Sequence, residues 1–306
     1  MDNVEDFTAA LNNPEVSAVN LSGDVAFAST QSITRPVTLD LGGHKITTTQ
    51  SGKTYMFNVK NDGVLTLKNG EVEANYRAGL AQNGGHIIVE SGTYTSKTNV
   101  VFECRTNGKV TVNGGTITGP EGAIIAPSAN GIIEVNGGKL EGLDNFAIAT
   151  NGNAGNNGNV ITVNDGELIG NIRSAGYEAI GVYIANQDTF VMNGGSITAH
   201  GGTGLCMRAG NVTINGGTIT ATGTDKNGNP VADGKIGDNS TVMTGVSAIV
   251  YHKHADYQNA GMKLRVAGGT ITGIDKSIDV VGMGEGEEPD IVVGVGASLT
   301  PAYPAA

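Results

Sequence analysis

The chain has 306 residues, of which 48 are Gly and none is Trp, and it carries a net charge of −11. Gly without a three-residue period excludes collagen, and a hydrophobic share of 39% is too high for a disordered chain. The acidic balance disfavours nucleic acid as a partner, because binding to its backbone depends on Lys and Arg replacing counterions. The composition therefore predicts a folded protein with an aliphatic core.

The first fifteen residues predict a short amphipathic helix. The segment "VEDFTAALNNPE" places Phe7, Ala10 and Leu11 on one helical face. The same residues contain several acids and no apolar run, so they lack the form of a secretion signal. No stretch of the chain is long and apolar enough to cross a bilayer, so we expect no membrane insertion.

A short segment recurs along residues 16–300. "TVNGGTITGP" at 111–120 returns as "TINGGTITAT" at 213–222 and as "RVAGGTITGI" at 265–274. Copies aligned on the second residue of the Gly pair lie about 23 residues apart, with insertions, which is the period of a solenoid. The aligned positions are Gly43, Gly70, Gly92, Gly115, Gly138, Gly166, Gly195, Gly217 and Gly269, with weaker copies at Gly23 and Gly296.

Around each Gly pair the apolar positions alternate with polar ones. Residues five and three places before the aligned Gly are apolar, and so is the residue two places after it, as Val110, Val112 and Ile117 illustrate. Alternation with a period of two predicts strands that have one buried face. A second apolar patch in each copy, such as "GAIIAP" or "NFAIAT", predicts a further strand.

These patterns predict an all-β protein with one domain over residues 1–306. We expect a single-stranded, right-handed parallel β-helix of about eleven coils, with the helix at 1–15 as its cap and coils over 16–300. Residues 221–241 and 251–261 are expected to form lateral insertions, and residues 301–306 a tail.

Two further columns follow from the alignment. Asn113, Asn136, Asn164, Asn193 and Asn215 lie two places before the aligned Gly, and their amides are expected to bond from coil to coil as a ladder. Cys104 and Cys206 both lie eleven places before an aligned Gly, which puts them in one column four coils apart. At about 4.8 Å per coil they are too distant for a disulfide, so we expect two buried free thiols.

The coil pattern and the Asn column resemble the pectate-lyase-like superfamily of right-handed parallel β-helices. This superfamily includes polysaccharide lyases, polygalacturonases, bacteriophage tailspikes and many surface proteins. The resemblance covers roughly residues 16–300 and does not extend to catalytic signatures, because no "NTD", "DD", "GHG" or "RIK" occurs. It implies a fold that hosts both enzymes and inert scaffolds, so function has to be argued from a site.

The acids that come nearest to a catalytic pair are Glu71 with Glu73, and Glu141 with Glu167. The first two flank one inward residue, and the second two are expected on neighbouring coils close to Lys139. Glycoside hydrolysis uses two carboxyl groups roughly 5–10 Å apart, which either pair could supply. Solvated surface charges are the alternative interpretation.

The second insertion, "YHKHADYQNAG" at 251–261, is the strongest candidate for a binding surface, since insertions emerge on the flank of a solenoid. A loop without function is the alternative. The expected contacts for a glycan or a protein are Tyr251, His252, His254, Asp256 and Tyr257. We expect no metal site and no cofactor, because the acidic run at 284–290 matches no calcium-binding spacing.

The sequence therefore favours a non-catalytic structural or adhesion protein. The first expectation is a bacteriophage virion surface component, such as a capsid decoration, fibre or spike, assembled in the host cytoplasm. Its partners would be host surface glycans or capsid and tail proteins, and the oligomeric state stays open. The alternatives are a bacterial cell-surface or secreted glycan-binding adhesin, and a polysaccharide lyase or glycoside hydrolase with an unrecognised acid pair.

Overall fold

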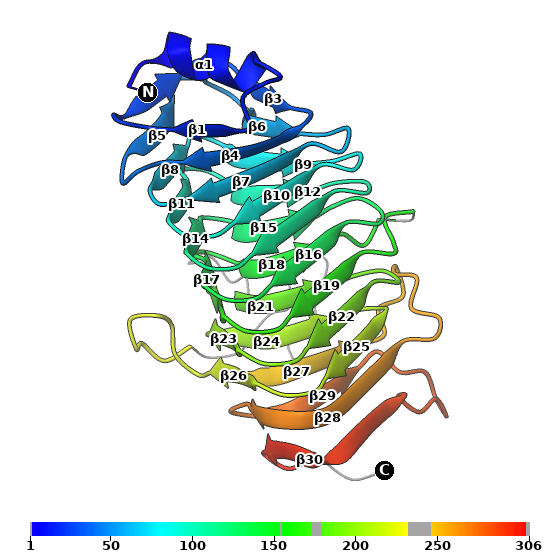
Figure 1. Cartoon of the computed structure of the whole chain (residues 1–306). Coiled ribbons are helices and arrows are strands. Elements are labelled where there is room, and N and C mark those ends of the chain that lie inside the picture. The colour runs from blue at the N-terminus through cyan, green and yellow to red at the C-terminus, as the bar shows by residue number, and fades with distance from the viewer. Residues whose placement is uncertain (1, 154, 173–178, 232–245, 304–306) are drawn as a thin grey trace.

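The computed structural model describes residues 2–153, 155–172, 179–231 and 246–303. The predicted cap is confirmed as helix α1 (Val4–Asn12), which begins after Asn3, whose side-chain oxygen accepts a hydrogen bond from the Asp6 amide at 2.9 Å. Phe7, Ala10 and Leu11 are its buried residues. Figure 1 shows α1 lying across the N-terminal end of a long stack of strands.

The described chain winds as a right-handed parallel solenoid of about eleven coils, so the predicted fold class is confirmed. Each coil contributes strands to three faces (Figure 1). The first face stacks β1 (Ala18–Asn20), β4 (Pro36–Asp40), β7 (Val64–Lys68), β10 (His86–Val89), β13 (Lys109–Val112), β16 (Ile132–Val135), β19 (Val160–Val163), β22 (Thr189–Met192), β25 (Asn211–Ile214) and the first halves of β28 (Lys263–Thr272) and β30 (Ile291–Thr300).

The second face continues from the first across the Gly pairs. It stacks β2 (Val25–Phe27), β5 (Lys45–Thr48), β8 (Glu71–Ala74), β11 (Thr93–Ser96), β14 (Thr116–Gly119), β17 (Lys139–Gly142), β20 (Glu167–Asn171), β23 (Ser196–His200), β26 (Thr218–Thr222) and the second halves of β28 and β30. Because β28 and β30 run through both faces without a break, the two faces join into one sheet at the C-terminal end.

The third face is a separate sheet of ten strands, called here the third sheet. It consists of β3 (Gln31–Ile33), β6 (Tyr55–Val59), β9 (Arg77–Ala81), β12 (Val100–Cys104), β15 (Gly122–Ala126), β18 (Phe146–Thr150), β21 (Ala179–Ile184), β24 (Gly202–Met207), β27 (Ser247–His252) and β29 (Lys276–Val281).

The apolar columns predicted from the repeat are confirmed by the strand register. Val112 pairs with Val135, and Val135 pairs with Val163, and all three side chains are fully buried. Burying one such side chain stabilises the fold by about 1.5–3 kcal/mol, so a column repeated over the stack supplies most of the core. The core is aliphatic along most of its length, with Phe7 stacked on Phe27 beneath the cap at 5.7 Å.

The Gly pairs form the corner between the first and second faces. Gly115 and Gly138 have φ values of 85° and 86°, a left-handed conformation that Gly adopts without strain. At Gly137, the first member of its pair, a Cβ would lie 2.8 Å from the carbonyl oxygen of Asn113 in the preceding coil. The repeated Gly pair therefore lets successive coils approach closely at a sharp corner.

The predicted Asn ladder is confirmed at this same corner. Each side-chain amide donates to the preceding Asn one coil away, at distances of 2.7–2.9 Å, and Asn113 donates to Glu90 at 2.9 Å. The ladder thus ties six consecutive coils together along the stack axis. Its rungs are solvent-exposed.

Both cysteines are free and buried, as predicted, but their predicted common column is wrong. Cys206 pairs with Tyr183, in the column that contains Glu103 and not Cys104. The corner that follows β24 is one residue shorter than the corner that follows β12. Counting backward from the Gly pair therefore shifts the register of the third sheet by one position.

The two predicted insertions differ from their expected bounds. The first begins beyond β26, which ends at Thr222, and residues 232–241 of it lie outside the described part of the chain. The second begins at Lys253, because Tyr251 and His252 still belong to β27. Insertions placed by sequence start too early, since each strand continues past the last apolar residue of the repeat.

Candidate ligand-binding site

The outer surface of the third sheet carries a depression of about 570 Å³, called here the open hollow. Its side chains come from β6, β9 and β12, from residues just before β6 and β9, and from the segments that follow β12, β15 and β18. Parallel stacking therefore brings together residues that are remote in sequence. The lining residues are Lys53, Tyr55, Tyr76, Arg77, Glu103, Arg105, Pro127, Ser128, Asn151, Asn153 and Asn156.

Glu103 lies at the centre of the open hollow and is 1% exposed. Its carboxylate accepts hydrogen bonds from the Tyr55 hydroxyl at 2.5 Å, from the Arg105 Nε at 2.6 Å and from the Arg77 guanidinium. A buried carboxylate needs such charged and hydrogen-bonding partners to offset its desolvation. Glu103 therefore fixes the positions of the three side chains around it.

Aromatic rings and guanidinium groups are interleaved across the open hollow. The Arg77 guanidinium carbon lies 4.8 Å from the ring centroid of Tyr76 and 5.7 Å from that of Tyr55, within cation–π distance. Burial, followed by the hydrogen bond to Glu103, raises the pKa of the Tyr55 hydroxyl to about 12. Tyr55 is thus a hydrogen-bond donor, and not a base, at neutral pH.

A second depression of about 530 Å³, called here the side hollow, adjoins the open hollow and shares Lys53 and Tyr76 with it. Arg77 Nε donates to Asn99 at 2.7 Å, and Asn99 donates to Glu121 at 2.7 Å, so hydrogen bonds connect the two. The full lining of the side hollow is Ser51, Gly52, Lys53, Asn75, Tyr76, Lys97, Thr98, Asn99 and Glu121.

Further along the same sheet, Tyr183, Arg208 and Tyr257 form a compact group called here the closed cluster. The two hydroxyls lie 2.9 Å apart, and Arg208 Nη1 donates to the Tyr257 hydroxyl at 2.9 Å. The Arg208 guanidinium carbon lies 5.4 Å from the Tyr183 ring centroid and 5.1 Å from that of Tyr257. Arg208 is only 2% exposed, because Tyr257 covers it from the second insertion.

Two of the five predicted binding residues are buried in strand β27. Tyr251 is 3% exposed, packs in the main core and donates its hydroxyl to the Met262 carbonyl at 3.0 Å. His252 is also 3% exposed, and burial lowers the pKa of its imidazole to about 4. At neutral pH His252 is therefore an uncharged part of the packed structure.

The other three predicted binding residues lie in the insertion itself. The His254 ring packs edge-on against His252 at 4.9 Å and against Tyr257 at 5.1 Å. The Asp256 side chain is 79% exposed. The structure thus brings the aromatic members together as a packed group, while Asp256 points into solvent. No group of three or more potential metal-ligating side chains occurs among the described residues.

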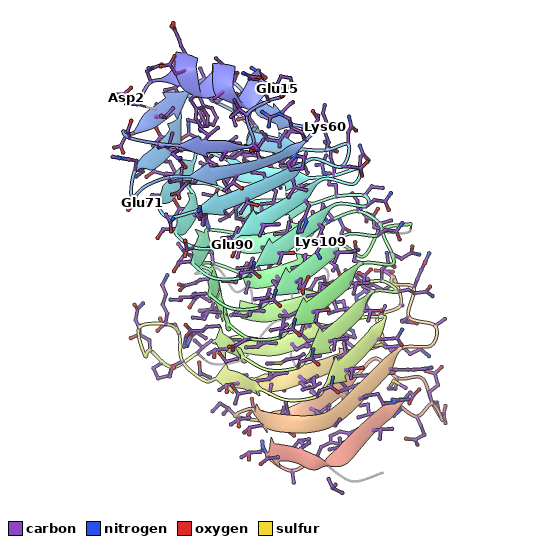
Figure 2. The ribbon with its side chains drawn as sticks, in the orientation of Figure 1. Asp2, Glu15, Lys60, Glu71, Glu90 and Lys109 are labelled. Carbon is purple, nitrogen blue, oxygen red and sulfur yellow. The ribbon has the colours of Figure 1, made fainter. Side chains whose placement is uncertain are left out.

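The predicted acid pairs line neither hollow. Glu73 makes ion pairs with Lys45 at 2.6 Å and Lys97 at 2.7 Å, and hydrogen bonds from these lysines lower the pKa of Glu73 to about 2. Glu71 lies on the flank formed by β8, where Figure 2 labels it, and is exposed. Because the two lysines keep the Glu73 carboxylate ionised, Glu73 is poorly suited to act as a general acid.

Glu141 and Glu167 lie on adjacent strands, β17 and β20, as expected. Lys139 is the register partner of Glu167 and forms an ion pair with Glu141 at 2.9 Å. Asn171 donates to Glu141 at 3.1 Å. The group is a charge network on the second face and contributes no residue to either hollow.

Sequence reasoning missed the open hollow. Its central residues occur in or beside the segments "YMFNV", "RAGLA" and "VVFEC", none of which was predicted to contain a site. The available signal was the placement of Tyr55, Arg77 and Glu103 within or beside otherwise apolar strands. Predicting that these three residues lie together requires the register between third-sheet strands. The variable length of the corners conceals that register in the sequence.

Comparisons with protein-family models, curated proteins and solved structures found no match to this chain. No helix in the described residues is long and apolar enough to span a membrane.

Proposed function

We propose that this protein is a non-catalytic, saccharide-binding β-helix displayed on a virion or bacterial surface, and that the open hollow is its binding site. The observation that carries this proposal is the Glu103-centred group, which holds Tyr55, Arg77 and Arg105 in a depression open to solvent, with Tyr76 packed against Arg77. Aromatic rings with a few positioned polar groups are typical of small-ligand sites.

The composition of the open hollow suits a sugar ring. A pyranose has apolar C–H faces that pack on aromatic rings and hydroxyl edges that need donors and acceptors. Tyr76 supplies an aromatic face, and the amides of Asn151, Asn153 and Asn156 supply hydrogen-bonding groups at the rim. Because Tyr55, Arg77 and Glu103 come from stacked strands, this part of the site is pre-organised and loses little entropy on binding.

The same geometry favours binding over catalysis. Glu103 is the only carboxyl group that lines the open hollow among the described residues, whereas glycoside hydrolysis uses two. Three donors already occupy its oxygens, and the high pKa of Tyr55 removes that hydroxyl as a base at neutral pH. We therefore expect binding without turnover.

The surface context of the proposal comes from the fold. A stiff, acidic solenoid with an Asn ladder suits the non-catalytic members of the pectate-lyase-like superfamily, on phage particles first and on bacterial envelopes second. Peptides of this chain should then appear in mass spectra of purified phage particles. Their occurrence in envelope fractions alone would favour the bacterial adhesin, and their absence from both would contradict surface display.

A saccharide array probed with the full chain tests the binding function. The unaltered protein should bind at least one glycan class, and Tyr76→Ala should abolish this binding with an unchanged circular dichroism spectrum. Tyr257→Phe, which keeps its ring but loses the hydroxyl of the closed cluster, is the matched control and should bind normally. Release of reducing or unsaturated ends would contradict the non-catalytic assignment, and loss of binding only in the Tyr257 variant would move the site to the second insertion.

A further inference from the structure

The two adjoining hollows form a cationic area on an acidic protein. Among their lining residues, four cations, Lys53, Arg77, Lys97 and Arg105, accompany two acids, Glu103 and Glu121, which leaves an excess of two positive charges. The whole chain carries −11. Such a local reversal of sign attracts anions and disfavours a cationic partner.

The two arginines differ in their exposure to solvent and in the number of contacts that they already make within the protein. Arg77 lies deep, with its side chain 13% exposed, and serves Glu103 and Asn99. The Arg105 side chain is 43% exposed, and it donates to the Glu103 carboxylate through Nε. A guanidinium has five N–H donors in a planar fork, which matches an oxyanion such as a carboxylate or phosphate. Arg105 is therefore the group best placed to meet an anion from solvent.

The lysines extend the cationic area toward the side hollow. Lys53 is exposed and lines both hollows, and the Lys97 side chain is 54% exposed beside Glu73. Tyr76 also belongs to both hollows, so one aromatic side chain lies at their junction. Each hollow has the size of a small-ligand site. Their contact through shared residues suits a chain of sugars better than a single sugar.

We propose that the two hollows together bind an anionic oligosaccharide, with Tyr76 contacting a sugar ring at the junction and Arg105 binding the charged group. This inference rests on the proposed saccharide-binding function and adds the ligand's charge, its length and the residue that selects it. A neutral glycan would offer the exposed guanidinium of Arg105 no anionic partner besides Glu103. The anionic group replaces the water that hydrates this guanidinium in the free protein.

The test is isothermal titration calorimetry of the full chain with matched oligosaccharides. One series carries carboxylates, one carries phosphates, and one is the carboxyl-reduced neutral form of the first. An anionic series should bind at least about tenfold more tightly than the neutral one, and the advantage should shrink as salt rises from 50 to 500 mM. Hexasaccharides should bind more tightly than disaccharides, because only they reach both hollows.

Variants locate the selectivity. Arg105→Ala should remove the preference for the anionic series, Arg105→Lys should retain part of it, and Tyr76→Ala should weaken binding of every series. Arg265→Ala is the control, because Arg265 is another partly exposed arginine, paired with Asp290 on the first face, and its loss should change nothing.

The outcomes separate this inference from the function on which it rests. Equal affinity for neutral and anionic series, or an anionic preference that survives Arg105→Ala, would overturn the inference and leave saccharide binding intact. Equal affinity for disaccharides and hexasaccharides would overturn the joint use of the two hollows. Failure of every series to bind would overturn both.

Discussion

The open hollow and the closed cluster use the same chemical elements on the same sheet, with opposite results. In both, an arginine lies over two tyrosine rings, Arg77 in the first and Arg208 in the second. The first is open to solvent, whereas an insertion covers the second and leaves its arginine 2% exposed. Covering by a loop therefore separates a surface available to a ligand from one that fastens the loop to the solenoid.

The largest expected effect comes from replacing one arginine in each of these two regions by Ala and comparing the losses of stability. Arg208→Ala should lower the free energy of unfolding by about 3 kcal/mol, because it removes buried packing and the guanidinium group that donates to the Tyr257 hydroxyl. Arg105→Ala should lower it by about 1 kcal/mol or less, since a half-exposed guanidinium is screened by solvent. Urea titration followed by circular dichroism gives both values. Equal losses would show that the open hollow is also a structural fastening.

A buried carboxyl group in the corner between β21 and β22 adds a prediction about pH. Asp188 is fully buried, accepts hydrogen bonds from the Asn159 backbone at 2.9 Å and side chain at 3.0 Å, and has its pKa raised by burial to about 6. Since the unfolded value is 3.8, the favourable contribution is complete below about pH 4 and is lost as pH rises through 6.

The size of this pH effect follows from the shift in pKa. A shift of about two units corresponds to roughly 3 kcal/mol at most. The difference in unfolding free energy between the unaltered protein and Asp188→Asn should therefore change between pH 4 and pH 7, in favour of the Asn variant at the higher pH. Glu73, whose pKa is lowered to about 2, acts with the opposite sign and cancels in this difference. A pH-independent difference would contradict the buried ionisation.

The smallest effect is expected outside both regions, in the Asn ladder. Asn164 donates to Asn136 at 2.7 Å and accepts from Asn193 at 2.8 Å. Asn164→Ala breaks both bonds in a solvent-exposed position, so a loss of about 1 kcal/mol is expected in urea titration. It should leave saccharide affinity unchanged. A loss as large as that of Arg208→Ala would mean that the ladder, and not the core, determines coil stacking.

The fold was predictable from sequence because one local pattern repeats. Val112, Val135 and Val163 hold the same place relative to a Gly pair, and identical geometry in each coil stacks identical positions. The site was not predictable in this way, because it depends on outward residues that occur once each. The corners between the third sheet and the first face vary in length, with three residues after β24 and nine after β18, which hid the register of Glu103 and misplaced Cys206.

The second insertion is another place where the sequence did not predict which side chains are exposed. Its aromatic and His residues were expected to face a ligand, and sequence gives no means of telling an outward loop from one that folds back. Tyr257 folds back because a hydrogen bond to Arg208 and contact with His254 offset the entropy of ordering the loop. Asp256, which has no such packing, is the member that stays in solvent.

Hydroxyl-radical footprinting with and without an anionic hexasaccharide tests the central claim most directly. The reaction labels exposed tyrosine rings, so a bound ligand protects the rings that it covers. We expect protection of Tyr76, partial protection of Tyr55 and unchanged labelling of Tyr257. Protection confined to Tyr257, with Tyr76 labelled equally in both samples, would contradict it.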